Sequence, residues 1–149
     1  MNVIETSEAW HRVFDDGFTA YIGAVERLVC DGKPQEMLRF RLEPHHMGPD
    51  GASSRGLLMA LMDTMLWAVI LENIYGCLTP PSGEGATTVS LNADFLGTAT
   101  AGETVYGVGE ITRRTRSIVF ISGRLFTRNA DGNERGLLSA LGVWKILGA

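Results

Sequence analysis

The feature that most constrains the fold is an apolar run from Leu57 to Leu71, interrupted only by one Asp-Thr pair. At about 15 residues the run is shorter than the ~20 residues that a bilayer span needs. The run shows no strand-like alternation, and Ser53 or Ser54 could cap a helix that starts near Arg55. A helix that is apolar on all sides must be covered by the rest of the chain. We therefore predict a buried central helix around which the other elements fold.

The segment before this run predicts a short helix followed by a hairpin. Residues 7–16 carry apolar side chains at helical spacing, between Ser7 as a possible N-cap and Gly17 as a stop. Residues 18–29 and 37–42 show loosely alternating apolar side chains on either side of an Asp-Gly turn. This pattern is typical of two paired strands.

After a loop rich in Pro and Gly at residues 78–85, the chain carries only strand patterns. Segments rich in β-branched and aromatic residues predict four strands, at 87–95, 103–112, 117–128 and 136–146. We expect these four strands to form an antiparallel meander.

The order of elements predicts an α+β fold in a single domain over residues 1–149. An antiparallel sheet would wrap the long central helix, with a short helix at the N-terminus, because only a curved sheet covers an apolar helix on several sides. This arrangement is known as the hotdog fold. The chain is 45% hydrophobic and 20% charged, which is enough apolar surface to form a packed core.

Charge and cysteine content exclude several classes of function. A net charge of −4 without any Lys/Arg block argues against a nucleic-acid partner. Cys30 and Cys77 are too few for a disulfide framework or a multi-cysteine metal site. The stretch from Met1 to Glu8 lacks the basic start and apolar run of a signal peptide. We therefore expect a cytoplasmic protein that binds neither nucleic acid nor membrane.

Asp63 is the one charged residue within the apolar run. Helical spacing places Asp63 on a stripe with Met59 and Trp67, where a carboxylate is hard to solvate. Such a carboxylate could act as a general base. Alternatively, the stripe faces solvent or Asp63 bonds a neighbouring backbone group, and the residue type alone does not decide between these roles.

The start of the predicted helix is a second candidate. Small residues from Gly51 to Gly56 surround a helix N-terminus, whose free N–H groups and dipole can polarise a carbonyl or hold an anion. Asp63 lies roughly 10–12 Å further along the helix, too far to act on the same small group within one chain. A partner chain could close this gap. The competing explanation is that the glycines only form a turn.

Other polar clusters carry weaker signals. His45 and His46 are adjacent, but no Asp, Glu or Cys stands at zinc-ligand spacing nearby, so no metal site is expected. Arg113, Arg114 and Arg116 lie on a turn between predicted strands, where they could bind phosphates or simply face solvent. A serine hydrolase is disfavoured because no serine on the strands has a Gly-x-Ser-x-Gly context.

Several of these motifs resemble one family in order and spacing. The segments Gly56–Thr64 and Thr88–Leu96 are similar to the helix motif G-x-L-x-x-L-x-D-T and the following strand of PaaI-like acyl-CoA thioesterases, within the hotdog superfamily. Ala101–Glu103 resembles the G-D/E turn of that family, and Arg116–Val119 resembles its R-S strand start. The resemblance runs from Gly51 to Val143.

The resemblance implies a homodimer with one continuous sheet, often paired again into a dimer of dimers, and two active sites at the dimer interface. By position, Asp63 would be the general base or nucleophile, and the backbone N–H of Arg55 or Gly56 would bind the thioester carbonyl. Thr88 stands where the family often has a Ser or Thr that orients water or the carboxylate. The substrate would be an acyl-CoA, with coenzyme A as part of the substrate and no separate cofactor.

The chain departs from the family pattern just before the helix. The usual His-Gly-Gly is Ser54-Arg55-Gly56 here, and Gly48 replaces an expected Asn, with His46 or Asp50 as possible stand-ins. Arg55 adds a cation that would favour an acidic substrate or the phosphates of coenzyme A. Ser54, His46, Gly48 and the three arginines of the turn are therefore candidate substrate-binding residues.

Three functions follow. The leading hypothesis is hydrolysis of an acyl- or aryl-CoA thioester. The alternative is a non-catalytic hotdog protein that binds an acyl or aromatic ligand in the same groove. An enoyl-thioester hydratase ranks third, because the usual Asp–His pairing around the helix start is not evident.

Overall fold

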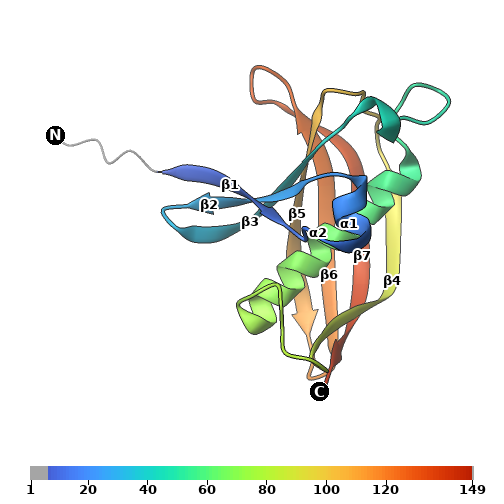
Figure 1. Cartoon of the computed structure of the whole chain (residues 1–149). Coiled ribbons are helices and arrows are strands. Elements are labelled where there is room, and N and C mark those ends of the chain that lie inside the picture. The colour runs from blue at the N-terminus through green and yellow to red at the C-terminus, as the bar shows by residue number, and fades with distance from the viewer. Residues whose placement is uncertain (1–6, 149) are drawn as a thin grey trace.

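The long central helix is present where the sequence predicts it, and it lies across one face of a curved antiparallel sheet (Figure 1). The structure, a computed structural model, describes residues 7–148. Residues 1–6, on which most of the signal-peptide argument depends, and residue 149 lie outside the described residues. The elements in chain order are β1 (Glu8–Val13), α1 (Gly17–Ile22), β2 (Val25–Cys30), β3 (Lys33–Arg41), the 3₁₀ turn η1 (Pro44–His46), α2 (Arg55–Tyr75), β4 (Gly85–Phe95), β5 (Thr104–Arg114), β6 (Ile118–Arg128) and β7 (Glu134–Leu147).

The ends of α2 are set by local chemistry. Ser54 is the N-cap, and its side chain accepts a hydrogen bond from the N–H of Leu57. Gly76 ends the helix in a left-handed conformation, with φ 68°, which glycine adopts without steric penalty. At 21 residues, α2 is long and apolar enough to cross a membrane by length and composition alone, so the sequence argument from the shorter apolar run was too strict. Nine of its side chains are buried, and most of them belong to the core between α2 and the sheet, so α2 is the core helix of this fold.

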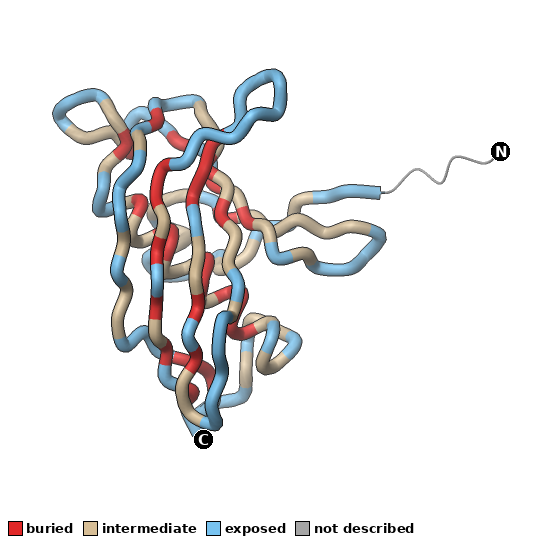
Figure 2. The backbone as a smooth tube through the Cα atoms, turned by 180° about the vertical axis from the view of Figure 1, so that it is seen from behind, coloured by how far each residue is buried: buried red, intermediate tan, exposed pale blue. Residues whose placement is uncertain are grey.

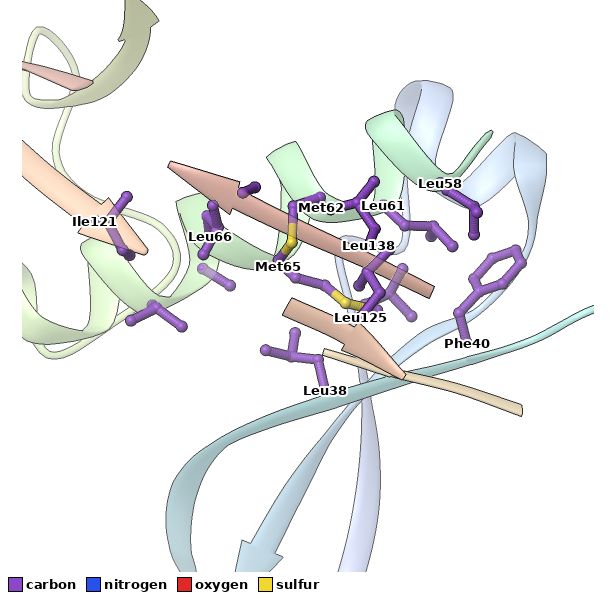
Figure 3. Close-up of a cluster of buried hydrophobic side chains, with 14 of the residues drawn as sticks. Leu38, Phe40, Leu58, Leu61, Met62, Met65, Leu66, Ile121, Leu125 and Leu138 are labelled. Carbon is purple, nitrogen blue, oxygen red and sulfur yellow. The ribbon is translucent and has the colours of Figure 1, made fainter. Parts of the chain in front are cut away.

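The core lies between α2 and the inner face of the sheet. In Figure 3, labelled side chains of α2, such as Met62, Met65 and Leu66, point toward residues of β3, β6 and β7. Gly109 and Gly123 pair across β5 and β6 directly below the helix. A Cβ atom on Gly109 or Gly123 would lie 2.6 or 2.5 Å from the end of the Leu66 side chain, so a larger residue at either position would force that side chain to shift. Tight packing against the sheet therefore fixes the position of α2.

The prediction that the short N-terminal helix spans residues 7–16 is wrong. These residues contain β1, which pairs antiparallel with β2, and the only short α-helix in residues 7–148 is α1, inside the segment expected to be a strand. The hairpin itself is confirmed, with strands at Val25–Cys30 and Lys33–Arg41. A helix shorter than about 12 residues is marginal by itself, whereas β2 offers hydrogen-bond partners along the whole of β1.

The four-strand meander is correct only for its last three strands. The sheet order is β1-β2-β3-β5-β6-β7-β4, so β4 lies at an edge beside β7 while β5 pairs with β3. The helix α2 carries the chain across the sheet to this edge before β5 returns to the middle (Figure 1). Strand patterns in a sequence do not reveal such a crossover, because they record which face is apolar and not which strand is the neighbour.

Along the strands, residues whose side chains point away from α2 are exposed, and they alternate with residues buried against the helix. Figure 2 shows the face of the sheet away from α2, where buried and exposed positions alternate along β7. Apolar side chains including Leu141 and Phe120 are exposed there. Among the described residues, the outer edge of β4 pairs with no strand. This free edge is the border of the candidate site.

Candidate active site

Asp63 and Thr88, two of the residues singled out from the sequence, meet at the free edge. The Thr88 hydroxyl on β4 donates a hydrogen bond of 2.6 Å to Oδ1 of Asp63 on α2. Asp63 is half-buried and Thr88 is exposed. Within residues 7–148 the carboxylate has no other hydrogen-bond partner, so Oδ2 can interact with a ligand. The site thus has one oriented carboxylate beside an exposed strand.

Trp67 lies one helical turn beyond Asp63 on the same face of α2. Its indole N–H donates a hydrogen bond of 3.0 Å to the carbonyl oxygen of Ala86, so both side chains reach β4. Phe14, which the sequence placed in a helix, stacks on Trp67 with ring centroids 5.1 Å apart. Neither aromatic residue was expected in the site from the sequence. The only sequence signal for Trp67 was its spacing of four residues from Asp63.

The start of α2 has the free donors that the sequence predicted. The N–H of Leu57 bonds the Ser54 side chain, and the N–H of Leu58 bonds the Ser54 carbonyl. The N–H groups of Arg55 and Gly56 have no acceptor in the part of the chain that the structure describes, and both residues are exposed. The first turn carries no acidic residue, so the positive end of the helix dipole is not neutralised. This helix start can hold an oxyanion or another anion.

The two halves of the site do not meet within one chain. The α2 helix is continuous from Arg55 to Tyr75, so the rise per residue puts Asp63 about 10–12 Å from the free N–H groups. This separation agrees with the sequence argument. A second protomer would be needed to bring an oxyanion site to Asp63.

The loop before α2 is held by structural contacts. His46 is buried, its Nδ1 accepts a hydrogen bond of 2.8 Å from the N–H of Glu43, and its Nε2 lies 2.5 Å from the carbonyl oxygen of Ile22. These partners require a neutral ring with the proton on Nε2. Gly48 donates to and accepts from the backbone of the same loop, and Asp50 accepts from the N–H of Ala52. Both ring nitrogens of His46 are therefore already used within the protein.

The three arginines lie far from the helix start. Arg113 and Arg114 are the last two residues of β5 and do not lie on the turn as predicted, because the strand runs two residues further than its pattern indicated. Arg116 lies in the turn before β6, and all three are exposed. The loop before the other end of β5 contacts Ser53, immediately before α2. With 11 residues at about 3.3 Å each, β5 separates these two ends by more than 30 Å. The structure does not bring the arginines and Arg55 together within one chain.

A large groove on the sheet lies away from Asp63. An open groove of about 1010 Å³ lies on the sheet, lined mainly by polar residues of β4 to β7 that point away from α2. Asp63 and Thr88 are on the other face. Because Thr88 is exposed and β4 lies at an edge of the sheet among the described residues, the site at Asp63 is open to solvent along this edge.

Thiol and metal chemistry have little support in residues 7–148. No group of three or more His, Cys, Asp or Glu side chains could hold a metal ion in this part of the chain. Desolvation raises the pKa of the Cys30 thiol, and the carboxylates of Glu8 and Asp31 add to the effect. A raised pKa keeps the thiol protonated and therefore weakly nucleophilic.

Comparisons with known proteins give one family and one fold. The family model described as the thioesterase superfamily matches residues 51–131, a range that contains both Asp63 and Thr88. No curated protein is similar enough in sequence to count as a match.

Three solved structures illustrate the likeness in fold. The E. coli PaaI protein from the phenylacetic acid degradation operon has a TM-score of 0.69 at 12% identity, covering 91% of this chain and 88% of that chain. The BH2602 protein from Bacillus halodurans, solved with CoA, has a TM-score of 0.63 at 18% identity, covering 76% and 68%. A hexameric broad-specificity acyl-coenzyme A thioesterase has a TM-score of 0.60 at 18% identity, covering 72% and 75%. These matches confirm the predicted hotdog fold.

Proposed function

The chain belongs to the thioesterase superfamily, and from this premise we propose that it hydrolyses the thioester bond of an acyl- or aryl-CoA. The observation that carries the proposal is the Asp63 carboxylate, oriented by Thr88 and otherwise free to react. Two structural neighbours, one solved with CoA and one an acyl-coenzyme A thioesterase, support the substrate class.

The reaction needs the ionised Asp63 carboxylate near the carbonyl carbon of the thioester. As a general base, Asp63 takes a proton from water, and the oxygen of that water adds to the thioester carbon. The tetrahedral intermediate then expels the thiolate, which takes the proton from Asp63 and leaves as free coenzyme A beside the carboxylic acid. As a nucleophile, Asp63 would instead attack the thioester carbon and expel the coenzyme A thiolate, forming an anhydride. Water then cleaves the anhydride to the free acid and the Asp63 carboxylate, and the thiolate takes up the proton that this water releases. In both routes the Thr88 hydroxyl holds Oδ1, so that Oδ2 faces the substrate.

The second protomer supplies the oxyanion site in this proposal. The β4 edge has 11 residues, no Pro and no charged residue before Asp94, so it is a template for pairing with another strand. The opposite edge, β1, has six residues and carries Glu8, His11 and Arg12. Pairing of two β4 edges would make a homodimer with one continuous sheet and place one protomer's α2 beside the Asp63 of the other. The free N–H groups of Arg55 and Gly56 would then stabilise the developing oxyanion.

Coenzyme A carries phosphates that need cations. Arg55 beside the oxyanion donors and the exposed Arg113, Arg114 and Arg116 are the proposed phosphate contacts, with Ser54 holding the helix start in shape. The roles of these arginines, the dimer of dimers and a cytoplasmic location stay predictions.

One observation favours the alternative of a non-catalytic acyl-binding protein. The family's His-Gly-Gly is replaced by Ser54-Arg55-Gly56, and His46, the possible stand-in, is buried with both nitrogens engaged. His46 therefore offers no free ring nitrogen to the carbonyl site.

Turnover of a CoA-thioester panel, followed by detection of the free thiol, separates the two functions. We expect steady-state release of CoA from at least one acyl- or aryl-CoA by the full-length protein. Tight binding of the same thioesters without thiol release would establish the non-catalytic alternative.

A further inference from the structure

Phe14 and Trp67 form a rigid aromatic pair next to the proposed catalytic carboxylate. Their ring planes are 17° apart and their centroids 5.1 Å apart. The hydrogen bond from the Trp67 indole to the carbonyl of Ala86 fixes the rotation of the ring. Both residues are partly buried against the core, so one side of each ring is supported and part of each stays accessible. The pair can therefore act as a wall for a ligand.

Two distances place this wall close to Asp63. Residues four apart on a helix have Cβ atoms about 5–6 Å apart, which applies to Asp63 and Trp67. The same two side chains bond β4 at Thr88 and Ala86, two residues apart and therefore about 6.6 Å along the strand. A thioester whose carbonyl carbon contacts Asp63 thus has the indole within the length of a short acyl chain.

Charge indicates which end of the substrate faces the pair. Phe14 is followed directly by Asp15 and Asp16, both exposed. Their carboxylates repel the phosphates of coenzyme A and would equally disfavour an acidic acyl group. The proposed phosphate contacts lie elsewhere, at the helix start and the β5–β6 turn. The uncharged acyl end is therefore the part that meets the aromatic wall.

The backbone conformation of Phe14 indicates that the surrounding structure holds this residue in place. Phe14 has φ 53°, a left-handed conformation that is a genuine outlier for a bulky residue. Such a residue persists when its surroundings over-determine it, and residues of this kind cluster at ligand sites. Phe14 also lies outside residues 51–131, the range of the family match, so this half of the wall comes from outside the part that the family model describes.

We propose that Phe14 and Trp67 form the end wall of the acyl site and limit the length of the acyl chain that it accepts. This proposal rests on the proposed function. The substrate class is then a short, uncharged acyl group. Larger acyl groups would have to displace a ring that stacking and a hydrogen bond hold in place.

Phe14→Ala tests the wall with acetyl-, hexanoyl-, decanoyl- and palmitoyl-CoA. We expect kcat/KM of the wild type to fall beyond the short chains, and Phe14→Ala to raise the ratio of decanoyl to hexanoyl turnover by about tenfold or more, the scale of discrimination in apolar pockets. Phe14→Trp should change the ratio in the opposite direction. Phe120→Ala, which removes the same ring from the outer face of the sheet, is the matched control and should leave the length profile unchanged.

Binding of non-hydrolysable thioether analogues of the same lengths gives a readout that does not depend on catalysis. A length shift in affinity without thiol release by any variant would leave the wall in place and reject the proposed hydrolysis. Unchanged length profiles in both turnover and binding for a folded Phe14→Ala would overturn the wall itself. If Phe14→Ala does not fold, Phe14→Leu carries the test with the same expected direction.

Discussion

Asp63 and His46 are both polar candidates for the site, yet their environments differ. His46 is 6% exposed and both of its ring nitrogens have partners, one on η1 and one at the end of α1. Asp63 is half-buried, with one oxygen bonded to Thr88 and the other without a partner among the described residues. His46 therefore ties loops together, whereas Asp63 retains capacity for a ligand.

The difference shows that the hydrogen-bond partners of a polar side chain distinguish a structural role from a catalytic one. A buried polar group with all partners inside the protein stabilises the fold, and removing it leaves those partners unsatisfied. A carboxylate that is oriented at one oxygen and free at the other is prepared for a reaction. Three substitutions can break or sharpen this comparison.

Asp63→Asn should have the largest effect. The amide keeps the shape and can still accept from Thr88, but it cannot take a proton or attack the thioester, so kcat should fall by about 10²–10⁴. We expect thermal unfolding and the oligomeric mass from light scattering to stay close to wild type. Asp94→Asn, an exposed carboxylate further along β4, is the matched control. Full turnover by a folded Asp63→Asn would remove the carboxylate from the mechanism.

His46→Ala should show the opposite pattern. It leaves the N–H of Glu43 and the carbonyl of Ile22 without their partner and opens a cavity, so the free energy of unfolding should fall by about 2–4 kcal/mol. Chemical denaturation measures the loss, and the rate per folded molecule should change little. If stability is retained and activity is lost, His46 acts on the substrate and the distinction drawn here fails.

Thr88→Val should give the smallest of the three effects. The valine keeps the volume but removes the hydrogen bond to Oδ1, and a bond to a charged group is worth about 1.5–3 kcal/mol, so kcat should fall by about 10- to 100-fold. Thr88→Ser retains the hydroxyl and should stay near wild type. Equal rates for Thr88→Val and wild type would show that the carboxylate needs no orienting partner.

Local sequence chemistry was enough to predict much of the molecule. The long helix, its start at Arg55 and the last three strands follow from a continuous apolar run, a serine cap and β-branched segments, all properties of short windows. The proximity of Asp63 and Thr88 came from the order of motifs in the family resemblance and not from periodicity.

Only the tertiary structure decided which residues distant in the chain contact one another. The edge position of β4, the strand at residues 8–13 and the stacking of Phe14 on Trp67 each depend on which segments meet after folding. The same holds for the contact of His46 Nε2 with the carbonyl of Ile22, which lies 24 residues earlier in the chain. Sequence patterns report which face of an element is apolar, because burial acts on each residue separately. They do not report the neighbour, because pairing and packing are settled by the whole fold at once.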